Sequence, residues 1–234
     1  MHSVNLNRFP SEKLTQVFDA LPFFHQLKSD LPQDYQTLFN HSKIVIAEMH
    51  EAIIRTGEFD SWFYFVLSGS LCVYLDESSS VPLGHIYPAE VVGALAIMHD
   101  TERSATVRVS GNKRCVLLAV DYTPFGELDD VSQISVEGKI ALLRFVSERT
   151  EARLRAYDQQ MPGTDLTARL QKQPMLSSDA STIDALHYWY YRIDALAGLL
   201  KDWNLTLENL DDYHPPLVAP SAELIHDIEQ LYFG

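Results

Sequence analysis

Hydrophobic and polar residues follow three different patterns along the chain, and the first predicts helices. Residues 11–21 place four apolar side chains on one face of a helix that begins at Ser11. Residues 32–42 predict a second short helix, with a proline near its first turn. The first forty residues are therefore expected to be helical.

The second pattern predicts strands. Runs of β-branched and aromatic residues are separated by glycine, proline, serine, aspartate and asparagine, a spacing typical of an antiparallel sandwich or barrel. The runs cover residues 43–49, 51–57, 63–76, 81–87, 104–110 and 114–121. Residues 76–80, Asp-Glu-Ser-Ser-Ser, are expected to form a polar hairpin tip.

The third pattern, from about residue 129, predicts helices again, with a break at Pro162-Gly163. One stripe alternates spacings of four and three, as in a seam between two helices. It consists of Val136, Ile140, Leu143, Ser147, Thr150, Leu154 and Tyr157. This seam predicts a homodimer through residues 136–157. Packing of the stripe within its own subunit is the alternative.

The remainder of the chain predicts a helical C-terminal module. Residues 181–203 form a strong helical pattern that begins with a capping box of Ser181 and Asp184, and residues 221–233 form another. We therefore expect three segments: a strand-rich domain with its leading helices over 1–128, a connecting helix over 129–160, and an acidic helical module over 161–234.

Charge disfavours nucleic acid as a partner. The formal net charge is −14, and residues 151–234 hold 6 Lys+Arg against 13 Asp+Glu. Phosphate neutralisation supplies much of the affinity of proteins for DNA, and this tail has few cations to offer. The tail is expected to pack against the rest of the chain or to bind a protein partner.

Other features narrow the function further. No apolar run reaches the roughly 18 residues of a membrane span, and the N-terminus does not resemble a signal peptide, so we expect a cytoplasmic protein. Cys72 and Cys115 lie in strand-like runs and are expected to be buried thiols. No catalytic motif or metal-ligand spacing occurs. The expectation is a protein that is no enzyme and holds no metal or cofactor.

One loop carries candidate chemistry. Gly93 follows a strand-like run, and one short helical turn there would point its backbone N–H groups at an anion. Arg103, ten residues later, can clamp two phosphate oxygens, and the small Ser104 lets a ligand approach. A surface connection with an exposed arginine is the other interpretation.

Residues from about 23 to 125 resemble the cyclic nucleotide-binding domain family, which includes catabolite-activator-type regulators and kinase regulatory subunits. Residues 21–27 resemble its lead-in helix, Gly57-Glu58 a turn, and residues 93–107, Gly-Ala-Leu to Arg-Ser-Ala-Thr-Val, its phosphate-binding cassette. The resemblance implies an α+β fold with an antiparallel β-roll flanked by helices. It also implies a ligand such as cAMP or cGMP. The implied phosphate contacts are Gly93, Ala94, Leu95, Arg103 and Ser104.

The cassette departs from the family pattern. Ala94 stands where the family has a glutamate that binds the ribose, and Ala89 stands where it has a glycine before Glu90. Loss of a charge-assisted hydrogen bond costs about 1.5–3 kcal/mol, or roughly ten- to a hundred-fold in affinity. Glu90 could replace the missing carboxylate, and Ser147 and Thr150 are candidates for contacts to ribose or purine.

The expected function is a regulatory or signalling protein in which weak or altered nucleotide binding is coupled to a helical output module. One alternative is a degenerate scaffold that binds no nucleotide and acts through protein contacts. The other is a catabolite-activator-type transcription regulator with an atypical DNA-binding tail.

Overall fold

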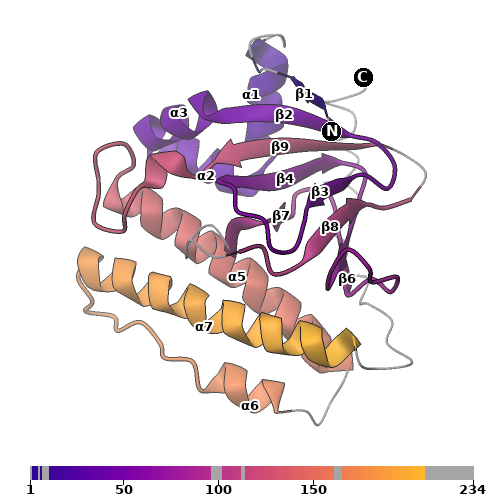
Figure 1. Ribbon diagram of the computed structural model, residues 1–234. Coiled ribbons are helices and arrows are strands. Elements are labelled where there is room, and N and C mark those ends of the chain that lie inside the picture. Colours follow the sequence, from indigo (N-terminus) through magenta and orange to yellow (C-terminus); the bar gives the residue numbers. More distant parts are fainter. Residues whose placement is uncertain are drawn as a thin grey trace.

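The computed structural model describes residues 2–4, 6, 11–95, 102–111, 114–160 and 165–208. Within them, nine strands form two antiparallel sheets, one of five strands in the order β1-β2-β9-β4-β7 and one of four in the order β3-β8-β5-β6 (Figure 1). The strands are β1 His2–Val4, β2 Ser42–Ala47, β3 Ala52–Ile54, β4 Trp62–Ser68, β5 Leu71–Tyr74, β6 Gly84–Ile86, β7 Val91–Val92, β8 Thr106–Val109 and β9 Cys115–Asp121. This arrangement confirms the predicted antiparallel β-fold flanked by helices.

The long apolar runs of β4 and β9 arise because the larger sheet is covered on both faces. Phe63 and Phe65 of β4 pack with the helices, whereas Tyr64 and Val66 pack into the space between the two sheets. Successive side chains of a strand point to opposite faces, so both faces must be apolar here. The two cores meet at this sheet.

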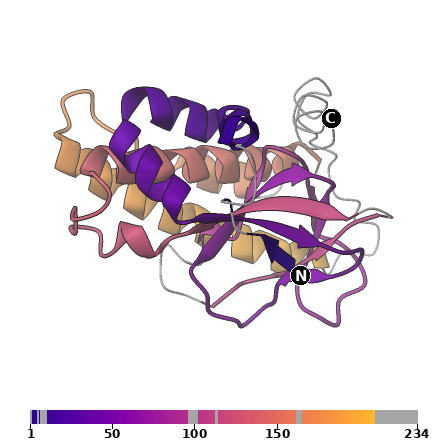
Figure 2. The same ribbon diagram turned by 90° about the horizontal axis from the view of Figure 1, so that it is seen from above.

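Three helices lie between β1 and β2: α1 Ser11–Asp19, α2 Pro22–Asp30 and α3 Pro32–Asn40. The predicted helices over 11–21 and 32–42 correspond to α1 and α3. Pro22 stands in the first turn of α2, where a missing N–H costs nothing. Figure 2 shows these helices beside the start of the long helix α5, Val136–Gln160. The ring of Phe23 in α2 packs against the ring of Phe145 in α5.

The C-terminal helices form a layer on the opposite side of α5 from the sheets (Figure 1). After α6, Leu166–Gln171, the chain returns, so that α7, Thr182–Glu208, runs alongside α5 in the same direction. Ser181 and Asp184 bond reciprocally: the Ser181 hydroxyl and N–H both donate to the Asp184 carboxylate, at 2.7 and 3.1 Å, and the Asp184 N–H donates to the Ser181 oxygen at 3.2 Å. The predicted capping box is therefore confirmed.

Most of the seam along α5 packs within its own chain, which was the alternative interpretation, and the homodimer through residues 136–157 stays a prediction. Five of its members are at most 7% exposed: Leu143, Ser147, Thr150, Leu154 and Tyr157. The stripe does contact a second helix, but that helix is α7 of the same chain, whose Leu186, Ile193 and Leu196 share its cores. Heptad spacing specifies a helical neighbour without specifying which chain supplies it.

Some predictions stay open. The helix expected over 221–233 and the break at Pro162-Gly163 lie outside the described residues. The three-segment division also stays a prediction, although α5 and α7 share their cores. No helix among the described residues has the length and apolar character that crossing a membrane requires.

Candidate functional site

A cavity of about 110 Å³ lies where the cassette faces α5 and α7. We call residues 90–95 and 103–105 its cassette wall. Its helical wall consists of Val146, Arg149, Thr150, Arg153 and Tyr157 of α5 together with Leu200 and Asn204 of α7. Ile54, Val73 and Val107 close it from the smaller sheet. The predicted site residues thus come together, except Ser147. Ser147 is buried in α5 outside the lining, and its hydroxyl has no hydrogen-bond partner among the described residues.

Arg103 on the cassette wall is engaged within the chain. Only 3% of it is exposed. Its Nε donates to one carboxylate oxygen of Asp60 at 3.3 Å and its Nη2 to the other at 2.5 Å. Nη2 also donates to the carbonyl of Trp62, and Nη1 donates to the carbonyl of Gly93. The bidentate contact that we expected with a phosphate is made here with Asp60.

The loop geometry around Arg103 requires the glycine of the cassette. Gly93 has a φ of +87°, which side chains other than glycine rarely adopt. A Cβ at this position would also lie 2.9 Å from Nη1 of Arg103. The backbone of Arg103 is held as well, because its N–H donates to the Glu58 carbonyl and its carbonyl accepts from Gly57, both at 2.9 Å. Gly93 and Arg103 therefore form one internally bonded unit.

The ribose side of the cassette wall carries Ala94 and Glu90. Ala94 lines the cavity and is also part of the main hydrophobic core. Glu90 accepts the Tyr87 N–H at 2.7 Å, and its other oxygen lies 3.9 Å from Nη2 of Arg153. Burial raises the pKa of Glu90, against the opposing effect of Arg153 and Arg149. A carboxylate therefore does line the cavity despite Ala94, but it comes from position 90.

The helical wall supplies polar groups that the sequence did not single out. Arg149 and Arg153 stand one turn apart on α5, on either side of the predicted contact Thr150. The Thr150 hydroxyl donates to the Val146 carbonyl of its own helix at 2.9 Å. Asn204 of α7 adds a carboxamide. The i, i+4 spacing of the two arginines beside the seam was the one available signal for this wall, since nothing in the sequence places α7 next to them.

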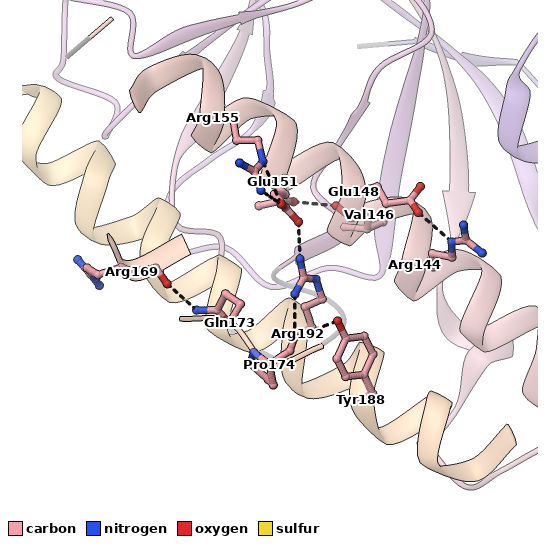
Figure 3. A network of polar contacts seen from close by, with 11 residues as sticks. Arg144, Val146, Glu148, Glu151, Arg155, Arg169, Gln173, Pro174, Tyr188 and Arg192 are labelled. Carbon is pink, nitrogen blue, oxygen red and sulfur yellow. Dashed lines mark hydrogen bonds and ion pairs between the residues drawn. The ribbon is translucent and has the colours of Figure 1, made fainter. Parts of the chain in front are cut away.

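A polar network fixes α7 against α5 (Figure 3). Glu151 of α5 accepts from Arg155 one turn further on, with Nη2 at 2.5 Å, and from Arg192 of α7. Arg192 also donates to the Pro174 carbonyl at 3.3 Å, where the Tyr188 hydroxyl donates at 3.1 Å. Burial of Glu151 tends to raise the pKa of its carboxyl, but these two arginines outweigh burial and lower the pKa. The network holds α7 in the position from which Leu200 and Asn204 close the cavity.

The cysteines are buried and unpaired, as predicted. Cys72 lies 3.3 Å from Nδ1 of His85, and burial raises the pKa of the Cys115 thiol to about 12. Within the described ranges, no three histidine, cysteine or acidic side chains group so as to hold a metal ion. The candidate site is therefore the cavity and its two walls.

Comparison with known structures finds similarity to cyclic nucleotide-binding proteins at low sequence identity. The regulatory domain of Toxoplasma gondii PKA, solved with cAMP, is 19% identical over 71% of this chain and 59% of its own, with a TM-score of 0.47. A regulatory subunit of a cAMP-independent protein kinase A from Trypanosoma brucei is 20% identical over 58% of this chain and 45% of its own, with a TM-score of 0.46. The alignments thus span about half of those kinase subunits.

A putative cyclic nucleotide-binding protein from Geobacter metallireducens is 14% identical over 62% of this chain and 99% of its own, with a TM-score of 0.49. At the level of sequence, residues 45–130 match the model of the family described as "Cyclic nucleotide-binding domain". The match begins in β2 and extends beyond β9, so it includes the whole cassette wall. Residues 45–130 of this chain are therefore similar to the cyclic nucleotide-binding domain family.

Proposed function

We propose that this chain is a non-catalytic regulatory sensor. Its cavity binds a phosphate-bearing small molecule of the cyclic nucleotide class, weakly or with altered specificity, and α7 transmits the occupancy. The observation that carries the proposal is the position of the cavity, which has the family cassette on one side and α7 on the other.

The size of the cavity supports a coupling between binding and α7. Its volume of about 110 Å³ is below the roughly 300–1,000 Å³ typical of small-molecule sites. A nucleotide therefore requires one wall to move. The cassette wall is tied to Asp60 and Trp62, whereas Leu200 and Asn204 lie 8 and 12 residues beyond Arg192, which bonds α7 to Glu151 of α5. In this mechanism the ligand displaces the C-terminal part of α7, a shift between two populations.

The outward face of α7 is suited to the output. Ile183, Tyr191 and Leu205 are large apolar residues that are exposed along this helix. A shift of α7 changes how this face is presented to a protein partner. DNA is a weaker candidate for the output, because only four cations lie in or beside α6 and α7: Arg169, Lys172, Arg192 and Lys201. One of them, Arg169, pairs with Asp202 at 2.7 Å.

Calorimetric titration with cAMP, cGMP and cyclic di-GMP tests the sensor proposal. Wild type is compared with Leu200→Ala, which enlarges the cavity, and with Leu205→Ala, which truncates an exposed leucine of the same helix. We expect measurable binding of at least one nucleotide and a several-fold gain with Leu200→Ala alone. Absence of binding to both wild type and Leu200→Ala at millimolar concentration contradicts the proposal.

That negative result would favour a second function, a scaffold that binds no nucleotide. The internal pairing of Arg103 with Asp60 is the observation in its favour, because four of the five N–H donors of the guanidinium already have partners. In the scaffold, α7 would present its outward face permanently.

A further inference from the structure

Two arginines of the helical wall differ from Arg103 in that no carboxylate of the described residues forms a hydrogen bond with them. Nη2 of Arg153 lies 3.9 Å from Glu90, at the outer limit of an ion pair and beyond hydrogen-bond distance. The guanidinium of Arg149 lies over the ring of Phe145, 5.4 Å from its centre. Side chains four residues apart are neighbours on a helix surface, so these two cations lie side by side at the cavity.

The charges that line the cavity favour an anion on this side. Among the described residues, four charged side chains line it: Glu90, Arg103, Arg149 and Arg153. Arg103 is neutralised by Asp60 from outside the lining, which leaves two cations against one carboxylate. Burial of Glu90 favours its neutral form, which increases the positive excess. A bound anion would restore the balance.

A carboxamide of α7 belongs to the same wall. Asn204 of α7 is 7% exposed and lines the cavity, and none of the described residues forms a hydrogen bond with its side chain. Its amide is not among the fully buried polar atoms without a partner, so it is accessible from the cavity. It lines the cavity together with the two arginines, and the amide N–H₂ can donate to an anionic oxygen of a ligand.

The opposite end of the cavity is apolar. Ile54, Val73 and Val107 of the smaller sheet line it together with Ala94 and Leu95 of the cassette. This end suits a planar or aliphatic group that carries no charge. The cavity thus has a cationic end on the helices and an apolar end on the sheets.

We propose that the anionic group of the ligand binds to Arg149 and Arg153 of α5 and to Asn204 of α7, while its uncharged part packs against Ile54, Val73 and Val107. Arg103 then serves to hold the cassette. This inference rests on the proposed function and specifies the orientation of the ligand in that site. An anion bound to both helices would connect α5 directly to α7.

Binding of an anionic and an uncharged probe tests the orientation. Calorimetry with cAMP and with adenosine is run on wild type, on the double variant Arg149→Gln/Arg153→Gln, and on Arg55→Gln/Arg144→Gln. The last pair is exposed, removes the same total charge and leaves the cavity lining intact. Circular dichroism spectra and melting temperatures verify that all variants fold.

We expect cAMP affinity to fall about ten- to a hundred-fold or more in Arg149→Gln/Arg153→Gln, the effect of losing charge-assisted hydrogen bonds. Adenosine affinity should stay within about twofold of wild type. The exposed pair of substitutions should leave the affinities for cAMP and adenosine nearly unchanged, because salt screens charges on the surface. Unchanged cAMP binding in the cavity variant overturns the orientation and leaves the sensor proposal intact. Failure of cAMP, cGMP and cyclic di-GMP to bind either wild type or Leu200→Ala overturns both.

Discussion

The two walls of the cavity differ in how completely their arginines are engaged. On the cassette wall, Arg103 is buried and donates to Asp60, Trp62 and Gly93. On the helical wall, Arg149 and Arg153 make no hydrogen bond with any described residue, and of the two only Arg153 lies within ion-pair distance of a described carboxylate. An arginine with satisfied donors stabilises the fold, whereas one that lines a cavity with free donors is available to a ligand. A sequence motif does not distinguish the two cases.

The largest expected effect comes from breaking the cassette ion pair. Asp60→Ala leaves Arg103 buried without its carboxylate, which costs about 3–5 kcal/mol when an ion pair is buried. We expect a loss of about 3 kcal/mol in the free energy of unfolding, because Asp60 is itself partly exposed. Urea denaturation followed by circular dichroism measures it. Asp30→Ala, at an exposed aspartate, is the control and should change the value by less than about 0.5 kcal/mol. Equal effects of both would show that Arg103 is not held by Asp60.

The next effect concerns the glycine that accommodates Arg103. Gly93→Ala adds a Cβ at a positive φ and 2.9 Å from the guanidinium, so we expect it to destabilise the chain by about 1–3 kcal/mol. Gly198→Ala is the matched control in α7, where a Cβ would contact nothing within 4 Å. It should stabilise the chain by about 0.5–1 kcal/mol, because alanine favours helices. Opposite signs in denaturant melts are expected, and a neutral Gly93→Ala would contradict the close approach of Arg103.

On the helical wall, Glu151→Gln weakens the attachment of α7. The substitution removes the charge that pairs with Arg155 and Arg192, and we expect a cost of about 1 kcal/mol, since the pair with Arg192 is partly buried. Hydrogen exchange of the α7 amides should accelerate more than that of β4. Glu148→Gln, which breaks an exposed pair with Arg144 on the same helix, should cost only about 0.3–0.5 kcal/mol.

Acid should act on the same attachment. The pKa of Glu151 is lowered in the folded chain, so its contribution to stability is present above its ordinary pKa and is lost as the pH falls through the lowered value. Stability curves of wild type and Glu151→Gln should therefore converge in acid. Curves that stay parallel down to full protonation would contradict a charged Glu151 in this network.

The smallest effect is the pH dependence of ligand binding at Glu90. This carboxyl faces Arg149, Arg153 and Tyr157 of α5 and accepts the Tyr87 N–H, and burial raises its pKa. Between the ordinary and the raised value the folded chain binds a proton that the unfolded chain does not, so stability falls as the pH rises through this range. Protonation also removes a negative charge beside a bound anion. We expect cAMP affinity to rise a few-fold towards acid, and Glu90→Gln to abolish the change.

The sequence predicted the β-fold and the contents of the cassette wall because both are local. Alternating apolar residues give the strands, the pattern after the strand indicates Gly93 and Arg103, and the resemblance to the family cassette adds Ala94 to the same loop. It could not predict that Asp60 would take both bonds of Arg103, because the two residues are 43 positions apart and meet only through the pairing of the strands.

The helical wall was harder to predict for a related reason. The stripe on α5 indicated a neighbouring helix, and a second subunit was the expected source of it. The structure supplies α7 of the same chain, brought back by α6 and residues 172–181. Asn204 reaches the cavity only through that tertiary arrangement, and it lies just past the end expected for the helix. Long-range packing thus determined what local periodicity left open.

The position of the phosphate of a bound ligand tests the account most directly. In a crystal structure with 8-bromo-cAMP, anomalous scattering from bromine locates the base, and the orientation of the nucleotide then locates its phosphate. The account predicts the phosphate in contact with Arg149 and Arg153, with Asp60 still bonded to Arg103. A phosphate bonded to Arg103 and the Gly93 loop would contradict it.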